Sequence, residues 1–184
     1  MKPATLLRKT TESEERPAVK TPHDSGGVKS KPGPKIYLHP GQVFVSADPY
    51  EVTTILGSCV AVCIHDVVLR IGGIGHYLLP YEAGHGGIGA RFGDVAIQSV
   101  IAGLLRLGSQ KSNLRGKIFG GACVVDAFRG KDVHLGVQNL ELARKILSNE
   151  GISVVAEDVG GLRARKLIFN LKDGTVWIKE LNWK

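Results

Sequence analysis

Short runs of β-branched residues, separated by turn-forming residues, constrain the fold of this chain more than any other feature. Asp-Pro, Gly-Ser and Asp-Gly pairs separate these runs, as expected between strands. Asp173-Gly174 stands between two alternating runs and predicts a hairpin closed by a two-residue turn. Strands are predicted at residues 42–47, 52–56, 59–64, 70–79, 117–125, 153–157, 166–171 and 175–181.

Two further segments repeat their apolar residues with the period of a helix. They run from Asp94 to Leu107 and from Asn139 to Glu150. Asn139 is predicted to be the N-cap of the second helix, and Gly151 the residue just after its last turn. Many strands with two amphipathic helices predict an α/β domain in which helices pack outside β-sheets.

The N-terminal segment has a different composition from the rest of the 184-residue chain. Residues 1–35 are rich in charged residues, Pro, Ser, Thr and Gly, and hold almost nothing to bury. Such a segment cannot offset the entropy lost on ordering, so we expect a disordered basic tail. The Lys-Pro-Gly-Pro-Lys stretch at 31–35 marks its end. The folded domain is therefore predicted to span residues 36–184.

The charge and hydropathy of the chain exclude several classes of function. The formal net charge is +7, but residues 1–35 carry eight Lys and Arg against four Asp and Glu. The remaining residues are nearly balanced, with sixteen against thirteen, which disfavours a nucleic-acid partner. No apolar run approaches the roughly 18–20 residues that span a bilayer. The N-terminus lacks the pattern of a secretory signal, so we expect a cytoplasmic protein without membrane insertion.

Three cysteines, Cys59, Cys63 and Cys123, occur in the chain. An odd number argues against a secreted disulfide scaffold and favours free thiols in a reducing compartment. Cys63 and Cys123 are predicted to be small buried residues. Cys59, Cys63 and His65 share one face of a strand by parity, but they lack the usual ligand spacing of a zinc site. We therefore expect no metal.

Cys59 lies where a nucleophile is expected. It follows Gly57-Ser58 directly, at the point where the chain enters a strand. A nucleophilic thiol must be held at a turn or strand end where substrate and base can reach it. The backbone N–H of Cys59 is a candidate donor to a developing oxyanion. A cysteine in an apolar strand is usually a core residue, however, so this position alone leaves both interpretations open.

His76 is the candidate base for that thiol. It lies on the next predicted strand, in the run Arg-Ile-Gly-Gly-Ile-Gly-His, and consecutive strands are usually neighbours. An imidazole beside Cys59 could take the thiol proton and return it to the leaving group. The Thr53 hydroxyl could fix the tautomer of the imidazole, and Thr54 is an equal candidate by position. His85 is the rival base.

The segment Gly84–Gly89 matches the pattern G-x-G-x-x-G. A dinucleotide site requires this turn to open a helix directly, with an acidic residue about 20 positions further on. Residues 90–93 intervene before the predicted helix, and residues 104–109 contain no acidic residue. The segment is therefore predicted to be a loop beside the active site.

Several ordered blocks of the sequence resemble one protein family. LGSCVAVCIHD at 56–66, followed by IGGIGHYLLP at 71–80, resembles the CheD family of chemoreceptor glutamine deamidases. The likeness continues through ARFGDVAI, KIFGGA, LGVQN and EDVGG, and spans about residues 40–180. Two positions depart from the family pattern, Gln138 and Ala164, and both lie outside the blocks around Cys59 and His76.

The resemblance implies a site and a fold. It places the nucleophile on Cys59, the base on His76 and the third member of a triad on Thr53, six residues before the cysteine. It implies packed mixed β-sheets flanked by helices in an α/β/β/α-like arrangement, similar to the catalytic fold of cytotoxic necrotizing factor. The implied reaction converts a glutamine side chain to glutamate through a thioester, without a metal or cofactor.

The resemblance also implies partners. These are the cytoplasmic domain of a chemoreceptor and a CheC-type phosphatase. The alternative function is a binding module that engages receptors or that phosphatase with little catalysis. A pure binding module has no need of a triad, so the presence of Thr53, Cys59 and His76 favours the enzyme.

Overall fold

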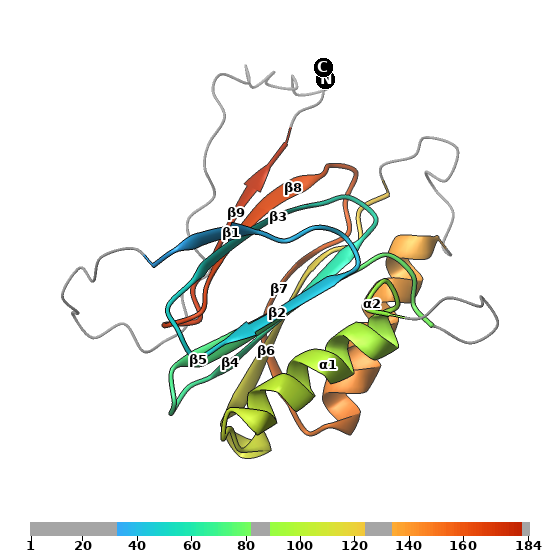
Figure 1. Ribbon diagram of the computed structural model, residues 1–184. Coiled ribbons are helices and arrows are strands. Elements are labelled where there is room, and N and C mark those ends of the chain that lie inside the picture. The colour runs from blue at the N-terminus through green and yellow to red at the C-terminus, as the bar shows by residue number, and fades with distance from the viewer. Residues whose placement is uncertain (1–32, 82–88, 124–133, 182–184) are drawn as a thin grey trace, which may run out of the picture.

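The computed structural model describes residues 33–81, 89–123 and 134–181. They form three layers, a four-stranded sheet, a five-stranded sheet and a pair of helices (Figure 1). The four-stranded sheet has the order β1-β3-β8-β9 and the five-stranded sheet the order β2-β5-β4-β6-β7. The strands are β1 (Lys35–Tyr37), β2 (Gln42–Ser46), β3 (Glu51–Leu56), β4 (Val60–Asp66), β5 (Ile71–Tyr77), β6 (Leu114–Gly120), β7 (Ser153–Val159), β8 (Arg165–Asn170) and β9 (Val176–Glu180), and the helices are α1 (Gly93–Arg106) and α2 (Leu135–Asn149), with a short 3-10 helix at Lys111–Asn113.

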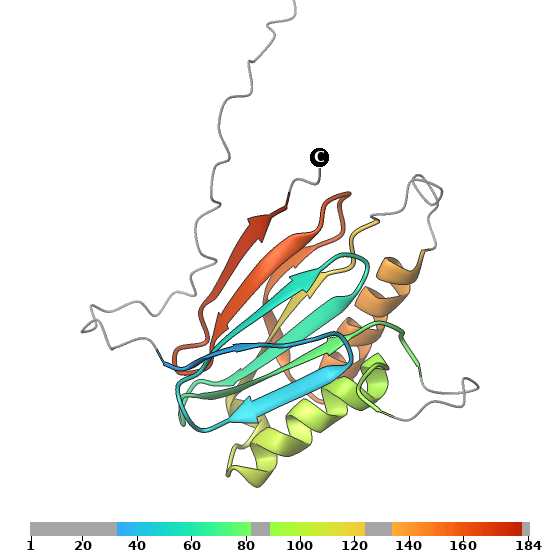
Figure 2. The ribbon, with the colours of Figure 1, turned by 45° about the horizontal axis from the view of Figure 1, so that its top comes forward.

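Both sheets are mixed. β1 runs parallel to β3, and β6 runs parallel to β7, whereas the other neighbouring strands are antiparallel. Both helices pack on one face of the five-stranded sheet, and the four-stranded sheet packs on the other (Figure 2). In the described part of the chain no helix covers the outer face of the four-stranded sheet. The predicted α/β class, with packed mixed sheets and flanking helices, is confirmed.

The five-stranded sheet is the middle layer, and this explains the continuous apolar runs of its central strands. Every residue of β4 and of β5 is buried. On β4, Val60, Val62 and Ile64 belong to the core beneath the helices. Ala61 and Cys63 belong to the core between the two sheets. A strand with both faces covered reads as unbroken apolar sequence rather than as alternation.

Most predicted elements are confirmed, with three corrections. α2 begins at Leu135, so Asn139 lies inside the helix and the prediction that it is the N-cap was wrong. The hairpin between β8 and β9 exists, but its loop runs from residue 171 to residue 175 rather than over two residues. β1 was not predicted, and it begins at Lys35, inside the segment assigned to the tail. Gly151, with φ 69°, follows α2 as predicted.

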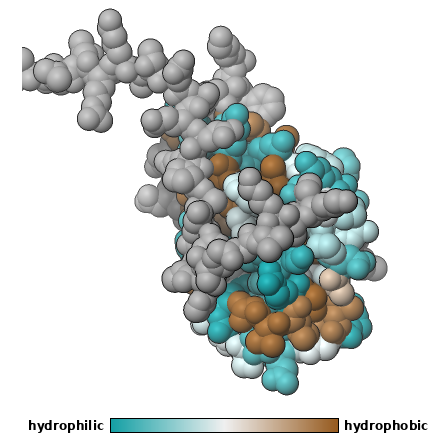
Figure 3. Space-filling model, turned by 90° about the vertical axis from the view of Figure 1, so that its left-hand side faces the viewer, coloured by the Kyte–Doolittle hydropathy of each residue, from teal (hydrophilic) through white to brown (hydrophobic). Residues whose placement is uncertain are grey.

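The turn between β4 and β5 exposes three apolar side chains, Val67, Val68 and Leu69. Apolar residues gather toward the lower end of the face shown in Figure 3, and the β4–β5 turn lies at the lower left of the ribbon in Figure 1. Because β4 runs from Val60 to Asp66, this turn is at the opposite end of the strand from Cys59.

No helix among the described residues is long and apolar enough to cross a membrane.

Candidate functional site

The turn that carries Cys59 and the end of β5 that carries His76 lie at the same end of the five-stranded sheet. β4 and β5 are antiparallel neighbours, as predicted, and Ala61 lies directly opposite His76. Cys59 is in the turn between β3 and β4, two residues before Ala61. By this register Cys59 and His76 are diagonal cross-strand neighbours, a relation in which long or aromatic side chains reach one another. Cys59 is partly buried, whereas His76 is fully buried.

A threonine of the other sheet orients the His76 ring. Thr54 Oγ1 lies 2.8 Å from His76 Nδ1 and also donates to the Leu38 carbonyl oxygen at 2.8 Å. Because Thr54 donates its hydroxyl proton to the Leu38 carbonyl, the Thr54 oxygen must accept from Nδ1–H of His76. This assignment leaves the lone pair of the neutral imidazole on Nε2. Nε2 is buried and has no hydrogen-bond partner among the described residues.

In the structure the contact with His76 Nδ1 is made by Thr54, whereas the catalytic role that the resemblance implies for Thr53 stays a prediction. On β3, Val52, Thr54 and Leu56 are buried, and the residues between them point to the opposite face. The face of β3 that carries Val52 and Leu56 packs toward the five-stranded sheet and His76. Only side chains on that face, Thr54 among them, can reach the imidazole. Thr53 uses its backbone carbonyl to accept from Leu38 N–H at 2.9 Å. In the sequence, Thr54 alternates with the apolar residues Val52 and Leu56, and this alternation was the signal that Thr54 faces the core.

Burial shifts the pKa values of both groups toward their neutral forms. It lowers the pKa of His76 to about 4, aided by nearby His39 and opposed by the polar backbone of Leu38. Burial raises the pKa of the Cys59 thiol, and the backbone N–H of Cys59 partly opposes this. Near pH 7 the site therefore holds a neutral imidazole and a protonated thiol.

The turn that carries Cys59 is fixed by the segment after β6. Gly121 N–H donates to the Cys59 carbonyl and Ala122 N–H donates to the Gly57 carbonyl, each at 2.8 Å. Gly120 has φ 102°, and a Cβ there would lie 2.3 Å from the Cys59 carbonyl oxygen. Only glycine permits this backbone conformation together with so close an approach.

Comparisons with known proteins identify the family of this chain. Residues 78–180 match the family model described as CheD chemotactic sensory transduction, which is more than half of the chain. The chain belongs to the CheD family. The resemblance inferred from the sequence blocks is confirmed.

Named relatives lie within the same family. A protein of Anaeromyxobacter dehalogenans is 46% identical over 147 residues, which is 80% of this chain and 85% of that protein. A protein of Sulfurimonas denitrificans is 37% identical over 145 residues, 79% of this chain and 93% of that protein. Both are named probable chemoreceptor glutamine deamidases. The crystal structure of the Bacillus licheniformis protein YfiH matches with a TM-score of 0.37 at 20% identity, covering 58% of this chain and 45% of that one, a likeness too low to assign a fold.

The sequence blocks of this CheD family member converge on the Cys59 turn. Gly120 and Gly121, from KIFGGA, contact the turn through the backbone. Gly136, from LGVQN, has no room for a Cβ because it would lie 2.4 Å from the Gly121 carbonyl oxygen. Gly160, from EDVGG, donates to the Gly120 carbonyl at 2.8 Å. These blocks therefore support the turn that carries Cys59.

Asn139 is a site residue that the sequence analysis missed. It is fully buried on α2, and its Nδ2 donates to the Leu78 carbonyl at 2.9 Å and lies 3.4 Å from the Ser58 carbonyl. The only signal for a role at the site was that Asn139 lies in LGVQN, one of the blocks shared with the family. An asparagine before an amphipathic run is also typical of a helix N-cap, which is how it was interpreted. Gln138, one of the two family departures, is exposed on the same helix, and Ala164, the other, is buried.

The remaining candidates lie away from Cys59 or outside the described residues. Cys63 and Cys123 are buried, as predicted. His65 Nε2 lies 3.3 Å from the Lys172 carbonyl oxygen, and within the described ranges no group of three or more acidic, His or Cys side chains could hold a metal. His85 and residues 84–88 of the glycine-rich segment lie outside the described residues. So does most of the predicted tail.

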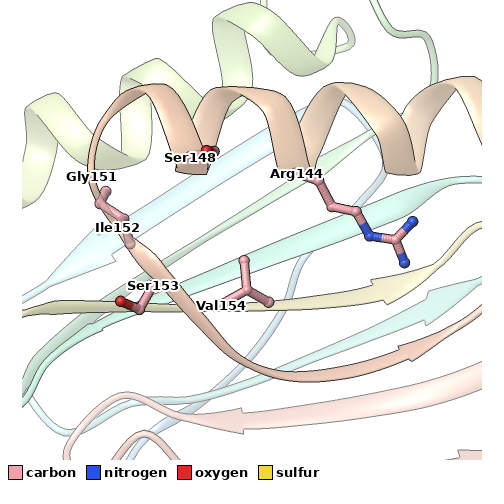
Figure 4. Close-up of a pocket in the computed structure, with 6 residues that line it drawn as sticks. All are labelled: Arg144, Ser148, Gly151, Ile152, Ser153 and Val154. Atoms are coloured by element: carbon pink, nitrogen blue, oxygen red, sulfur yellow. The ribbon is translucent and has the colours of Figure 1, made fainter.

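A pocket of about 360 Å³ lies between the end of α2 and the start of β7 (Figure 4). β7 begins beside Arg115, near the start of β6, whereas the Cys59 turn contacts the segment that follows the end of β6. The pocket is therefore remote from the candidate site. Its lining residues are Arg144, Ser148, Gly151, Ile152, Ser153 and Val154.

Gly120→Ala should destabilise the domain and disturb the Cys59 turn. The new Cβ meets the Cys59 carbonyl, and φ 102° is unfavourable for alanine. Gly108→Ala is the matched control, since Gly108 has φ 95° and no atom lies within 4 Å of the place its new methyl group would take. We expect Gly120→Ala to lower the free energy of unfolding by about 2 kcal/mol more than the control, as measured by urea denaturation. Equal losses would contradict the close packing described.

Proposed function

We propose that this chain is a cytoplasmic deamidase of chemoreceptor glutamine side chains, with Cys59 as nucleophile and His76 as general base. The observation that carries this proposal is the orientation of His76. Thr54 holds Nδ1–H, which leaves the unpartnered Nε2 lone pair on the ring that neighbours Cys59 across the strands. The names of the relatives supply the substrate, a chemoreceptor glutamine.

The reaction has two halves. In the first, Cys59 Sγ attacks the carboxamide carbon while its proton passes to His76 Nε2, and the Cys59 backbone N–H is the proposed donor to the oxyanion. The tetrahedral intermediate collapses when the proton is returned to the leaving nitrogen, which releases ammonia and forms a thioester. In the second half, His76 Nε2 takes a proton from water, whose oxygen attacks the thioester. Glutamate leaves, and the proton returns to the Cys59 sulfur.

The pKa shifts favour general-base catalysis over a stored thiolate–imidazolium pair. Burial opposes both the Cys59 thiolate and the His76 imidazolium. No Lys or Arg adjoins Cys59 in the sequence to stabilise a thiolate. The thiol proton is therefore transferred as the carbon–sulfur bond forms, and the resting site carries no charge.

The dependence of deamidation on pH should reveal the neutral base. Protonation of His76 removes the Nε2 lone pair, so kcat/KM for a receptor fragment should fall only as the pH approaches about 4. The same protonation opposes folding, so the free energy of unfolding should decline as the pH drops from about 6.5 toward 4. Circular dichroism at each pH separates the two effects. A half-maximal rate near pH 6.5 in folded protein would contradict a buried base.

Thr54→Val should reduce kcat about 10- to 100-fold, because Nδ1–H loses its acceptor and the productive tautomer is no longer favoured. Thr53→Val is the matched control on the opposite face of β3, and it should leave kcat within about twofold. Steady-state rates on the same receptor fragment measure both variants. A larger loss in Thr53→Val would assign the orienting role to the residue that the family resemblance indicates.

The substrate and partners follow from the same proposal. The substrate is the cytoplasmic domain of a chemoreceptor, where deamidation converts a neutral side chain to an acid. A CheC-type phosphatase is a proposed second partner. If the purified, folded chain bound a receptor fragment or that phosphatase but released no ammonia, the binding-module function would replace the enzyme.

Mass spectrometry of a receptor fragment tests the proposed function. After incubation with the protein, particular glutamines should gain about one mass unit, the difference between an amide and an acid. An incubation without the protein reports spontaneous deamidation. Receptor glutamines that all remain unchanged in the presence of folded protein would refute the proposal.

A further inference from the structure

Asn139 connects the two backbone segments that carry the nucleophile and the base. Its side-chain Nδ2 donates to the carbonyl of Leu78, two residues after His76, at 2.9 Å. The same nitrogen lies 3.4 Å from the carbonyl of Ser58, which directly precedes Cys59. One amide group on α2 thus bridges the end of β5 and the turn before β4.

The helix that presents this amide is itself held against β5. Tyr77, which follows His76, is fully buried and donates its hydroxyl to the Asn139 carbonyl oxygen at 2.6 Å. Gly136, one turn earlier on α2, contacts the segment after β6 that fixes the Cys59 turn. The Asn139 amide is therefore carried by a part of α2 that is held both to β5 and to the segment supporting the Cys59 turn.

The chemistry of the side chain matters here. The NH₂ group of asparagine offers two donors, one for each carbonyl, from a single atom. An ionised aspartate of the same shape offers only acceptors, and two carbonyl oxygens would then face a buried carboxylate. The side chain is fully buried, so solvent cannot replace the lost donors.

We propose that Asn139 is a positioning residue that fixes the distance between Cys59 and His76 through the backbone of Ser58 and Leu78. This inference rests on the proposed function for its kinetic consequence. Asn139 has no part in the proton transfers. Its effect on catalysis comes from holding the thiol and Nε2 in reach of one another, where a displacement of about 1 Å can cost about 100-fold in rate.

Asn139→Asp tests the proposal, with Asn149→Asp as the matched control because Asn149 is exposed near the end of the same helix. At pH 7.5 we expect kcat on a receptor fragment to fall about 100-fold, with KM changed by less than about threefold. As the pH is lowered and the new carboxyl binds a proton, it regains one donor. The rate relative to the control should therefore recover in part. Asn139→Ser replaces the two amide donors by one hydroxyl on a shorter side chain and adds no charge, so it should lose rate without that recovery.

Alkylation of Cys59 by iodoacetamide provides a readout that needs no receptor. Separation of the thiol from Nε2 should slow alkylation about tenfold in both Asn139 variants, as measured by peptide mapping of folded protein. A purely structural role predicts the opposite, faster alkylation as the buried turn opens, together with a lower melting temperature. If Asn139→Asp fails to fold, Asn139→Ser carries the test.

The outcomes separate the two proposals. Wild-type kcat and alkylation rates in a folded Asn139 variant would overturn the positioning role, and so would faster alkylation. Wild-type protein that leaves receptor glutamines unchanged, while alkylation slows in the Asn139 variants, would refute the deamidase and leave the positioning of Cys59 standing.

Discussion

Cys59→Ala is expected to reduce receptor deamidation at least about 1,000-fold, the largest effect of any substitution in this chain. Replacement of the thiol by hydrogen removes the proposed nucleophile, so no thioester can form at this position. Cys59 is only partly buried in a turn, so the variant should fold. Rates are measured as ammonia released from a receptor fragment, with folding checked by circular dichroism.

Cys63→Ala is the matched control for Cys59→Ala. Cys63 is 1% exposed and packs between the two sheets, where burial raises the pKa of its thiol. Its loss leaves a small cavity and should cost stability, about 1 kcal/mol, without reducing kcat. A Cys59→Ala protein that deamidates at the rate of Cys63→Ala would contradict the assignment of the nucleophile.

His76→Gln should reduce kcat about 100- to 10,000-fold, the second largest effect. Glutamine retains polar atoms near Thr54 but has no lone pair basic enough to accept the thiol proton. Because burial already opposes the Cys59 thiolate, the loss of the base is not compensated by ionisation of the thiol in water. Rates on the same receptor fragment measure the effect.

Two histidines control for His76→Gln. His39→Gln changes an exposed histidine near the site and should leave kcat within about twofold. His85→Gln tests the rival base from the glycine-rich segment. A loss confined to His85→Gln, with His76→Gln active, would transfer the role of base to His85.

The sequence was sufficient to predict that β4, which directly follows Cys59, pairs with β5, which carries His76. Their runs are apolar without interruption because β4 and β5 are covered on both faces, and consecutive strands usually pair. The parity of Thr53 and Thr54 was harder, since both precede the cysteine in a β-branched run. The choice became decisive when the structure placed Val52 and Leu56 in the core between the two sheets, where Thr54 also contacts His76.

Asn139 shows the limit of local sequence patterns. An asparagine before an amphipathic run is a common helix cap, so the helix was predicted to begin there. The structure begins α2 at Leu135 and buries Asn139 against carbonyls that are distant in sequence. Such contacts depend on the packing of α2 against the ends of β5 and of the Cys59 turn, and no local periodicity encodes them.

The central claim is that Cys59 forms a covalent bond to the substrate, and peptide mapping after an acid quench tests it most directly. Wild-type protein is mixed with a receptor fragment and stopped at successive times, with His76→Gln and Cys59→Ala alongside. We predict that the Cys59 peptide carries the mass of the glutamine-containing peptide less one ammonia, at early times and in wild-type protein only. Steady deamidation by wild-type protein with Cys59 unmodified at every time, and an equal rate in Cys59→Ala, would contradict the account.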